Sequence, residues 1–184
     1  ILYDKKIVKR AFSVKIKMFF LTFFAINATL FLNKKTGGNT MNLIPMPKNI
    51  TLLGGAFSYS AVKSAKYEED KRIEKALLNL PQSESGAEIV FKNEETDDEA
   101  YTLELSDKII ITAHSAKGVF YAIQTLRQLF CMPEIPKCKI SDKPDFAVRG
   151  FYQDLTRGKV AKLETLKKLA DKCAYFKINT IQLY

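Results

Sequence analysis

The chain has 184 residues, is 47% hydrophobic and 27% charged, and carries a formal net charge of +9. That charge is unevenly distributed, because residues 1–40 hold eight Lys or Arg and one acid, which leaves +2 for the other 144 residues. A nucleic-acid-binding surface requires Lys and Arg gathered on one element, with stacking or base-reading side chains among them. No such element follows Met41, so the sequence predicts no nucleic-acid partner.

The basic N-terminal segment contains a fifteen-residue apolar run, residues 18–32, with lysines on both sides. It is shorter than the roughly 20 residues that span a bilayer and has the length of a signal-peptide core, but no small-residue cleavage site follows it. Two interpretations stay open: an export signal or membrane anchor, and an untranslated upstream segment, since the chain begins with Ile1. Translation from Met41 predicts a cytoplasmic protein, and a translated leader predicts export or membrane association.

From Met41 the pattern predicts a small α+β domain that extends to about residue 144. Two short strands, 50–53 and 56–60, are expected around the turn Gly54-Gly55. The further elements expected in its first part are a helix over 69–80 that ends before Pro81, and strands over 87–92, 101–106 and 107–113.

The second helix of this domain is expected to follow Ser115, whose hydroxyl can accept a hydrogen bond from a first-turn amide. Pro133 and Pro136 end that helix and begin a linker that runs to about Pro144. The three consecutive isoleucines 109–111 indicate a strand buried on both faces. Together these elements predict an α+β sandwich with a mixed sheet and at least two helices.

No catalytic constellation is evident in residues 41–144. His114 is the only histidine of the chain, and it lies at a strand-to-helix corner where no spacing places a catalytic partner. The acidic run 97–99 is typical of a solvated loop, and glycine-rich nucleotide motifs and HExxH are absent. The cysteines are odd in number and lack CxxC spacing, so we expect buried free thiols and no metal or organic cofactor. They are Cys131, Cys138 and Cys173.

Residues 145–184 predict a βαβ unit. A strand over 148–155 is followed by the loop 156–158, a helix beginning near Lys162 with apolar residues three and four apart, and a second strand over 178–184. Parallel strands joined by a helix must bury both faces, so this unit is expected to be the beginning of a larger α/β domain.

Three separated motifs resemble glycoside hydrolase family 20, the β-N-acetylhexosaminidases. They are Leu43-Ile44-Pro45-Met46-Pro47, the run Gly118 to Leu129, and Arg149-Gly150-Phe151 through Asp154-Leu155-Thr156-Arg157. The resemblance implies a small α/β domain of no known catalytic role packed against a (β/α)₈ TIM barrel. This chain would carry strand 1, helix 1 and strand 2 of that barrel, with the remainder beyond Tyr184.

The resemblance also implies roles for individual residues. Arg149 matches an arginine that binds hydroxyls of the terminal N-acetylhexosamine, a task suited to the rigid donors of a guanidinium. The alternative for Arg149 is a pair with a neighbouring carboxylate at a domain seam. Asp154 and Arg157 match acidic and basic positions that support the site. Many members carry an aromatic residue or His where this chain has Gly158 and Lys159.

The family's mechanism is substrate-assisted retention, in which the sugar's 2-acetamido carbonyl attacks the anomeric carbon, a Glu protonates the leaving oxygen and an adjacent Asp orients the acetamido group. That Asp-Glu pair belongs to a later barrel strand, so these 184 residues are expected to be inactive alone. The expected partner is a glycan ending in N-acetylhexosamine.

Two alternatives remain. One is the O-GlcNAcase or hyaluronidase type, whose first strand reads Gly-Phe-Tyr-Gly followed by Pro-Trp, whereas this chain has Gln153 at the fourth position and no Trp. The other is a non-catalytic carbohydrate-binding or interaction module whose stable fold ends near Pro144.

Overall fold

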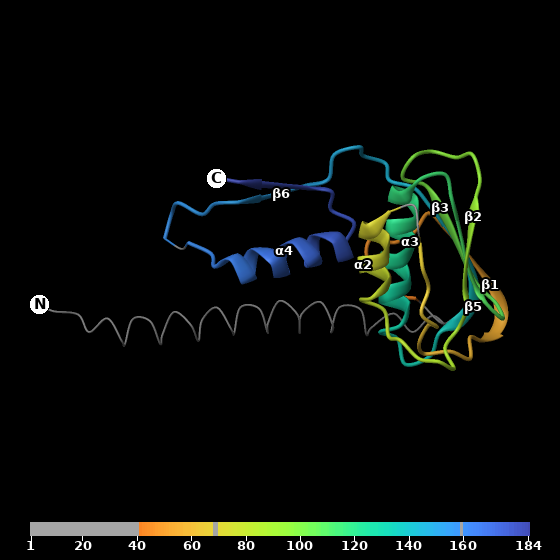
Figure 1. Ribbon diagram of the computed structural model, residues 1–184. Helices are drawn as coiled ribbons and strands as arrows, with labels where there is room; N and C mark the ends of the chain where they lie inside the picture. The colour runs from red at the N-terminus through yellow and green to blue at the C-terminus, as the bar shows by residue number, and fades with distance from the viewer. Residues whose placement is uncertain (1–40, 68–69, 159) are drawn as a thin grey trace, which may run out of the picture. The chain divides into compact units, whose positions relative to one another are not determined.

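The computed structural model describes residues 41–67, 70–158 and 160–184, which belong to one compact unit, Met41–Tyr184 (Figure 1). The apolar run 18–32 lies outside the described residues. Among the helices that are described, none is both long and apolar enough to cross a membrane.

A five-stranded mixed sheet forms the first part of this unit, with strand order β1-β5-β3-β4-β2. All neighbouring strands are antiparallel except β2 and β4, which are parallel. The mixed sheet with helices confirms the predicted α+β class of this part. The strands are β1 (Asn49–Ala56), β2 (Ile89–Asn93), β3 (Tyr101–Leu105), β4 (Ile109–Ala113) and β5 (Pro136–Asp142).

Two helices accompany the sheet, α2 (Lys71–Leu77) and α3 (Ala116–Leu129). Ser115 caps α3 as predicted, because its hydroxyl accepts a hydrogen bond from the Lys117 amide. Asp70 caps α2 in the same way through the Arg72 amide. α2 is shorter than the predicted 69–80 because residues 78–80 form a turn before Pro81.

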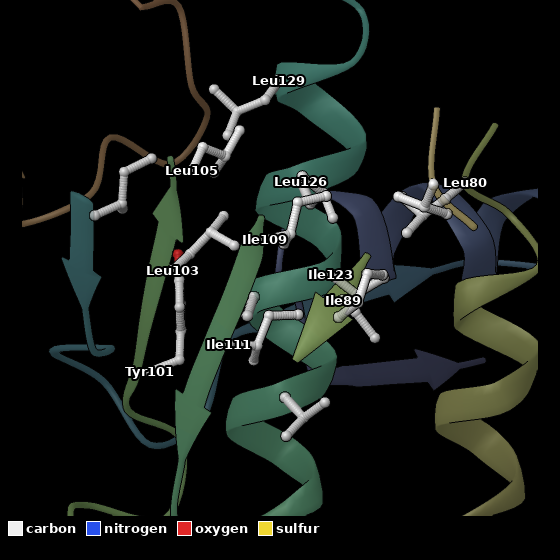
Figure 2. Packing of buried hydrophobic residues seen from close by; sticks show 14 of the residues in the cluster. Leu80, Ile89, Tyr101, Leu103, Leu105, Ile109, Ile111, Ile123, Leu126 and Leu129 are labelled. Atoms are coloured by element: carbon white, nitrogen blue, oxygen red, sulfur yellow. The ribbon is translucent and has the colours of Figure 1, made fainter. Parts of the chain in front are cut away.

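The hydrophobic core lies between α3 and the sheet (Figure 2). The apolar stripe of α3 meets alternate side chains of β3 and β4, which point to one face of the sheet. Residues of the core with no exposed surface are Leu103, Leu105, Ile109, Ile111, Ala122, Ile123, Leu126, Leu129, Cys138 and Ile140.

The expectation that 109–111 is buried on both faces was wrong. Ile109 and Ile111 are fully buried, whereas Ile110 is partly exposed. Helices α2 and α3 lie against a single face of the sheet (Figure 1), so the strand alternates between core and surface although its sequence does not.

The Gly54-Gly55 pair does not separate two strands. β1 continues through both glycines, which have φ of 81° and 78°, and its register against β5 shifts between Leu52 and Ala56. Positive φ is favourable for glycine, and an irregularity of register is the mark of a bulge. The predicted strand 56–60 is therefore absent, since β1 ends at Ala56.

The predicted linker from Pro133 to Pro144 was also wrong, because residues 136–142 form β5 between β1 and β3. Cys138 and Ile140 are fully buried on the core side, in the period-two alternation of a strand. Pro136 is tolerated because it is the first residue of the strand.

The cysteines divide between surface and interior. Cys138 and Cys173 are buried free thiols as predicted, and burial raises the pKa of Cys138 to about 11. Cys131 was expected to be buried and is instead exposed, because it follows the last turn of α3.

The second part of the unit is a βαβ unit, as the pattern predicts. β6 (Gly150–Gln153) and β7 (Thr180–Leu183) pair in parallel, and α4 (Leu163–Tyr175) connects them. Cys173 is the only buried residue of α4, and every residue of β7 is exposed.

Candidate functional site

Arg149, directly before β6, places its guanidinium against the small domain. Nη2 donates to Glu99 Oε2 at 2.7 Å and to the Tyr121 hydroxyl at 3.0 Å. Nη1 donates to the Phe146 carbonyl at 2.7 Å and Nε to the Lys177 carbonyl at 2.8 Å. The Arg149 and Glu99 side chains are only 18% and 19% exposed. In this structure Arg149 therefore pairs with a neighbouring carboxylate, which is the geometry that the alternative interpretation of Arg149 expects.

Lys177, between α4 and β7, forms a second buried ion pair with the small domain. Its ammonium donates to Asp142 Oδ2 at 2.8 Å and to the Tyr101 hydroxyl at 2.8 Å. The same hydroxyl lies 3.2 Å from Asp142 Oδ2 and 2.7 Å from Thr125 Oγ1. The Lys177 and Asp142 side chains are 8% and 11% exposed. Four side chains, from β3, α3, β5 and the segment between α4 and β7, thus form one buried polar cluster.

Burial changes the pKa of two members of this cluster, Lys177 and Tyr101. Desolvation lowers the pKa of Lys177, and the hydrogen bond to Asp142 opposes that change. Burial raises the pKa of Tyr101 well above its usual value, and the charge of Asp142 acts in the same direction. Tyr101 therefore stays protonated and can act as a donor at neutral pH.

α3 makes further polar contacts across the same seam. The Gln128 side chain exchanges two hydrogen bonds with the backbone of Ile44 and donates a third to the Tyr175 carbonyl. Arg127 pairs with Asp171 of α4 at 3.1 Å. The second motif, Gly118 to Leu129, thus lies on the helix that contacts both the first motif and α4.

A cavity of about 190 Å³ opens at the seam. Its acids are each paired with a cation: Glu99 with Arg149, Asp142 with Lys177, and Asp145 with Lys48. We therefore assign no catalytic step to this cavity.

Asp154 and Arg157 lie at the other end of β6. Asp154 Oδ1 accepts hydrogen bonds from the Thr156 amide, the Thr156 hydroxyl and the Arg157 amide. These bonds, that of the Thr156 amide first, lower the pKa of Asp154. The Arg157 guanidinium lies over the Tyr184 ring, 5.8 Å from its centroid, and the Tyr152 ring lies 6.1 Å from that of Tyr184.

The structure therefore brings Asp154 and Arg157 together and leaves Arg149 apart from them. Arg149 precedes β6 and Asp154 follows it, and the four residues of the strand between them separate their backbones by roughly 16 Å. Sequence reasoning missed Lys177, Asp142 and Tyr101. The one available signal was a lysine between Phe176 and Ile178, a charge within an otherwise apolar stretch.

Within Met41–Tyr184, a mixed sheet with two helices is thus joined by buried ion pairs to a parallel βαβ unit, which is an α/β arrangement. Residues 40–143 match the family model described as glycosyl hydrolase family 20, domain 2. That match covers more than half of the chain, so the chain belongs to glycosyl hydrolase family 20.

Individual relatives agree with this assignment. The chain is 33% identical to a β-hexosaminidase of Porphyromonas gingivalis, over 76% of this chain and 22% of that protein. A family 20 exo-β-N-acetylglucosaminidase of Vibrio harveyi, solved in complex with N-acetylglucosamine, matches with a TM-score of 0.65 and 29% identity over 78% of this chain and 25% of its own.

The N-acetyl-β-hexosaminidase of Streptomyces plicatus matches with a TM-score of 0.64 over 80% of this chain and 35% of its own, and its 22% identity shows a shared fold. The chain thus spans between about a fifth and a third of the length of these relatives.

Proposed function

We propose that this chain is part of a β-N-acetylhexosaminidase that removes terminal β-linked N-acetylhexosamine from glycans. Residues 41–144 would form its small domain, and residues 145–184 would form the first βαβ unit of a (β/α)₈ barrel. The observation that carries this proposal is the membership of family 20 together with a parallel β6–β7 pair joined by α4. The likeness to the Vibrio harveyi enzyme covers 78% of the chain, more than residues 40–143 alone.

Exposed apolar side chains on the βαβ unit support the proposal that it belongs to a barrel. Phe151 and Ile181 are each 36% exposed although they are paired in the centre of the parallel strands, and Leu163 of α4 is 66% exposed. Parallel sheets are normally covered on both faces. Further strands and helices of a barrel would bury these side chains.

The ends of β6 and β7 are where a substrate would bind, because active sites of such barrels lie at the C-terminal ends of the strands. Asp154, Arg157 and Tyr184 lie at that end. Their proposed role is to support the site, with the Asp-Glu pair supplied by a later strand. For Arg149 to bind sugar hydroxyls, its guanidinium would have to exchange Glu99 and Tyr121 for them, so that role is a separate prediction.

The proposed reaction is substrate-assisted retention. The 2-acetamido oxygen forms a bond to the anomeric carbon as the glycosidic bond breaks, and the Glu gives its proton to the leaving oxygen. A water then attacks the anomeric carbon, its bond to the acetamido oxygen breaks, the Glu takes a proton from the water, and the free sugar with its acetamido group restored is released. The adjacent Asp holds the acetamido group in position.

The dependence of the rate on the acetamido group tests this mechanism. The protein that continues past Tyr184 is expected to hydrolyse an aryl β-N-acetylglucosaminide, to slow progressively as fluorine on the acetyl group weakens its oxygen as a nucleophile, and to leave an aryl β-glucoside intact. The measurement is kcat/KM for each substrate. Comparable rates for the glucoside and the acetamido sugar would rule out substrate assistance.

A further inference from the structure

We propose that Lys177 is a positioning residue through which the small domain determines where β6 and β7 begin. Its effect on activity rests on the hexosaminidase function proposed above, whereas its effect on the two strands does not. The proposal rests on the backbone conformation of Lys177, on its buried partners, and on the bonds that continue from it to β6.

The backbone at Lys177 is unfavourable for a lysine. Its φ is 59°, which makes it the one non-glycine residue with positive φ among residues 41–67, 70–158 and 160–184. The position follows the C-terminus of α4, where glycine is the usual residue because it has no Cβ to clash. A lysine at such a position indicates that its side chain is needed there.

The side chain of Lys177 reaches into the small domain. It is almost completely buried, with the whole residue 6% exposed, and its ammonium is held by Asp142 and Tyr101 at 2.8 Å each. A buried ammonium is stable only while its carboxylate partner is in place. The segment that leads from α4 into β7 is therefore attached to β5 and β3 through Asp142 and Tyr101.

The attachment continues from β7 to β6. The Lys177 carbonyl accepts a hydrogen bond from Arg149 Nε at 2.8 Å. Asn179, two residues later, accepts from the Arg149 amide at 2.9 Å and donates to the Ala147 carbonyl at 2.8 Å. A contiguous set of bonds thus runs from Asp142 through Lys177 to the residues that precede β6.

Where β6 and β7 begin determines where the residues at their C-terminal ends lie. Each strand has four residues, so a displacement at Lys177 is carried along a short, paired segment to Asp154 and Tyr184. Displacement of a reacting group by about 1 Å can lower the rate of an enzyme about a hundredfold. The small domain would therefore influence the reaction without contacting the substrate.

Hydrogen exchange in the 184-residue chain tests the attachment directly. The variants are Lys177→Met, which keeps the length but removes the charge, and Asp142→Asn. We expect amide exchange in residues 150–153 and 180–183 to become at least about tenfold faster in both, with exchange in β3 and β4 unchanged. Lys108→Met is the matched control, because the ion pair of Lys108 with Glu88 is exposed. This variant is expected to leave amide exchange unchanged both in β6 and β7 and in β3 and β4.

Lys177→Gly keeps the test informative in case Lys177→Met does not fold, because glycine relieves the strained backbone while removing the ammonium. It is expected to show the same local acceleration. If amide exchange became faster by the same factor in all strands, Lys177 would contribute to global stability only. If amide exchange did not become faster in any strand, Lys177 would not hold β6 and β7 in place. Either result overturns the proposal.

Activity is the second readout. In the protein that continues past Tyr184, Lys177→Met is expected to lower kcat/KM about tenfold at a temperature where circular dichroism shows it folded, while Lys108→Met keeps the wild-type value. An inactive wild type would refute the hexosaminidase function and leave the exchange result standing. An active wild type with a fully active, folded Lys177→Met variant would refute the positioning role alone.

Discussion

Arg149→Ala is expected to lower the free energy of unfolding of the 184-residue chain by about 3 kcal/mol. The variant loses the bonds to Glu99, Tyr121 and two carbonyls and leaves the Glu99 carboxylate, whose side chain is 19% exposed, without its partner. Breaking a buried pair from one side costs more than the pair contributes, because the remaining charge stays desolvated. Urea unfolding followed by circular dichroism measures the change.

Glu99→Gln and Arg149→Lys separate the two roles of Arg149. A seam role predicts that both variants destabilise the chain and that neither changes KM in the protein that continues past Tyr184. A sugar-binding role predicts that Arg149→Lys raises KM while Glu99→Gln does not, because only Arg149 would contact the substrate. A stability change below about 0.5 kcal/mol in both variants would contradict the seam role.

Gly118→Ala is expected to destabilise the chain by about 2–3 kcal/mol. A Cβ at position 118 would lie 2.3 Å from the Ala100 carbonyl oxygen and 2.9 Å from the Ala113 Cβ. The first turn of α3 would have to move away from the ends of β3 and β4, which alters the packing of the core. The measurement is again the unfolding free energy, together with the melting temperature.

Gly150→Ala is the matched control for Gly118→Ala, because a Cβ at position 150 would have no heavy atom within 4 Å. It is expected to leave the stability of the chain within about 0.5 kcal/mol of the wild type. A Gly118→Ala variant as stable as Gly150→Ala would show that α3 does not approach the sheet as closely as described.

Much of the fold could be predicted from residue patterns because its elements follow local rules. Ser115 caps α3, and the period of three and four residues identified both α3 and α4. β5 was missed because Pro133, Pro136 and Pro144 suggest a linker, although the buried Cys138 and Ile140 alternate as in a strand. The sheet supplies the antiparallel neighbours that favour a strand there, and a local pattern does not contain them.

The candidate site was less predictable. Asp154 and Arg157 were predicted as supporting residues from the family resemblance, and their side chains lie 3.6 Å apart. Lys177 is separated by 35 residues from Asp142 and by 76 from Tyr101, and sequence spacing gives no information about such partners. The position of the Arg149 guanidinium was likewise undetermined, because both a sugar and a carboxylate suit its donors.

Hydrolysis of an aryl β-N-acetylglucosaminide is the assay for the proposed hexosaminidase function, with the 184-residue chain and the protein that continues past Tyr184 compared under the same conditions. We predict release of the aryl group by the longer protein only, because the proposed assignment gives residues 41–184 the small domain and the first βαβ unit of a barrel and places the catalytic Asp-Glu pair on a later strand. Hydrolysis by the 184-residue chain itself, or an inert longer protein, would contradict it.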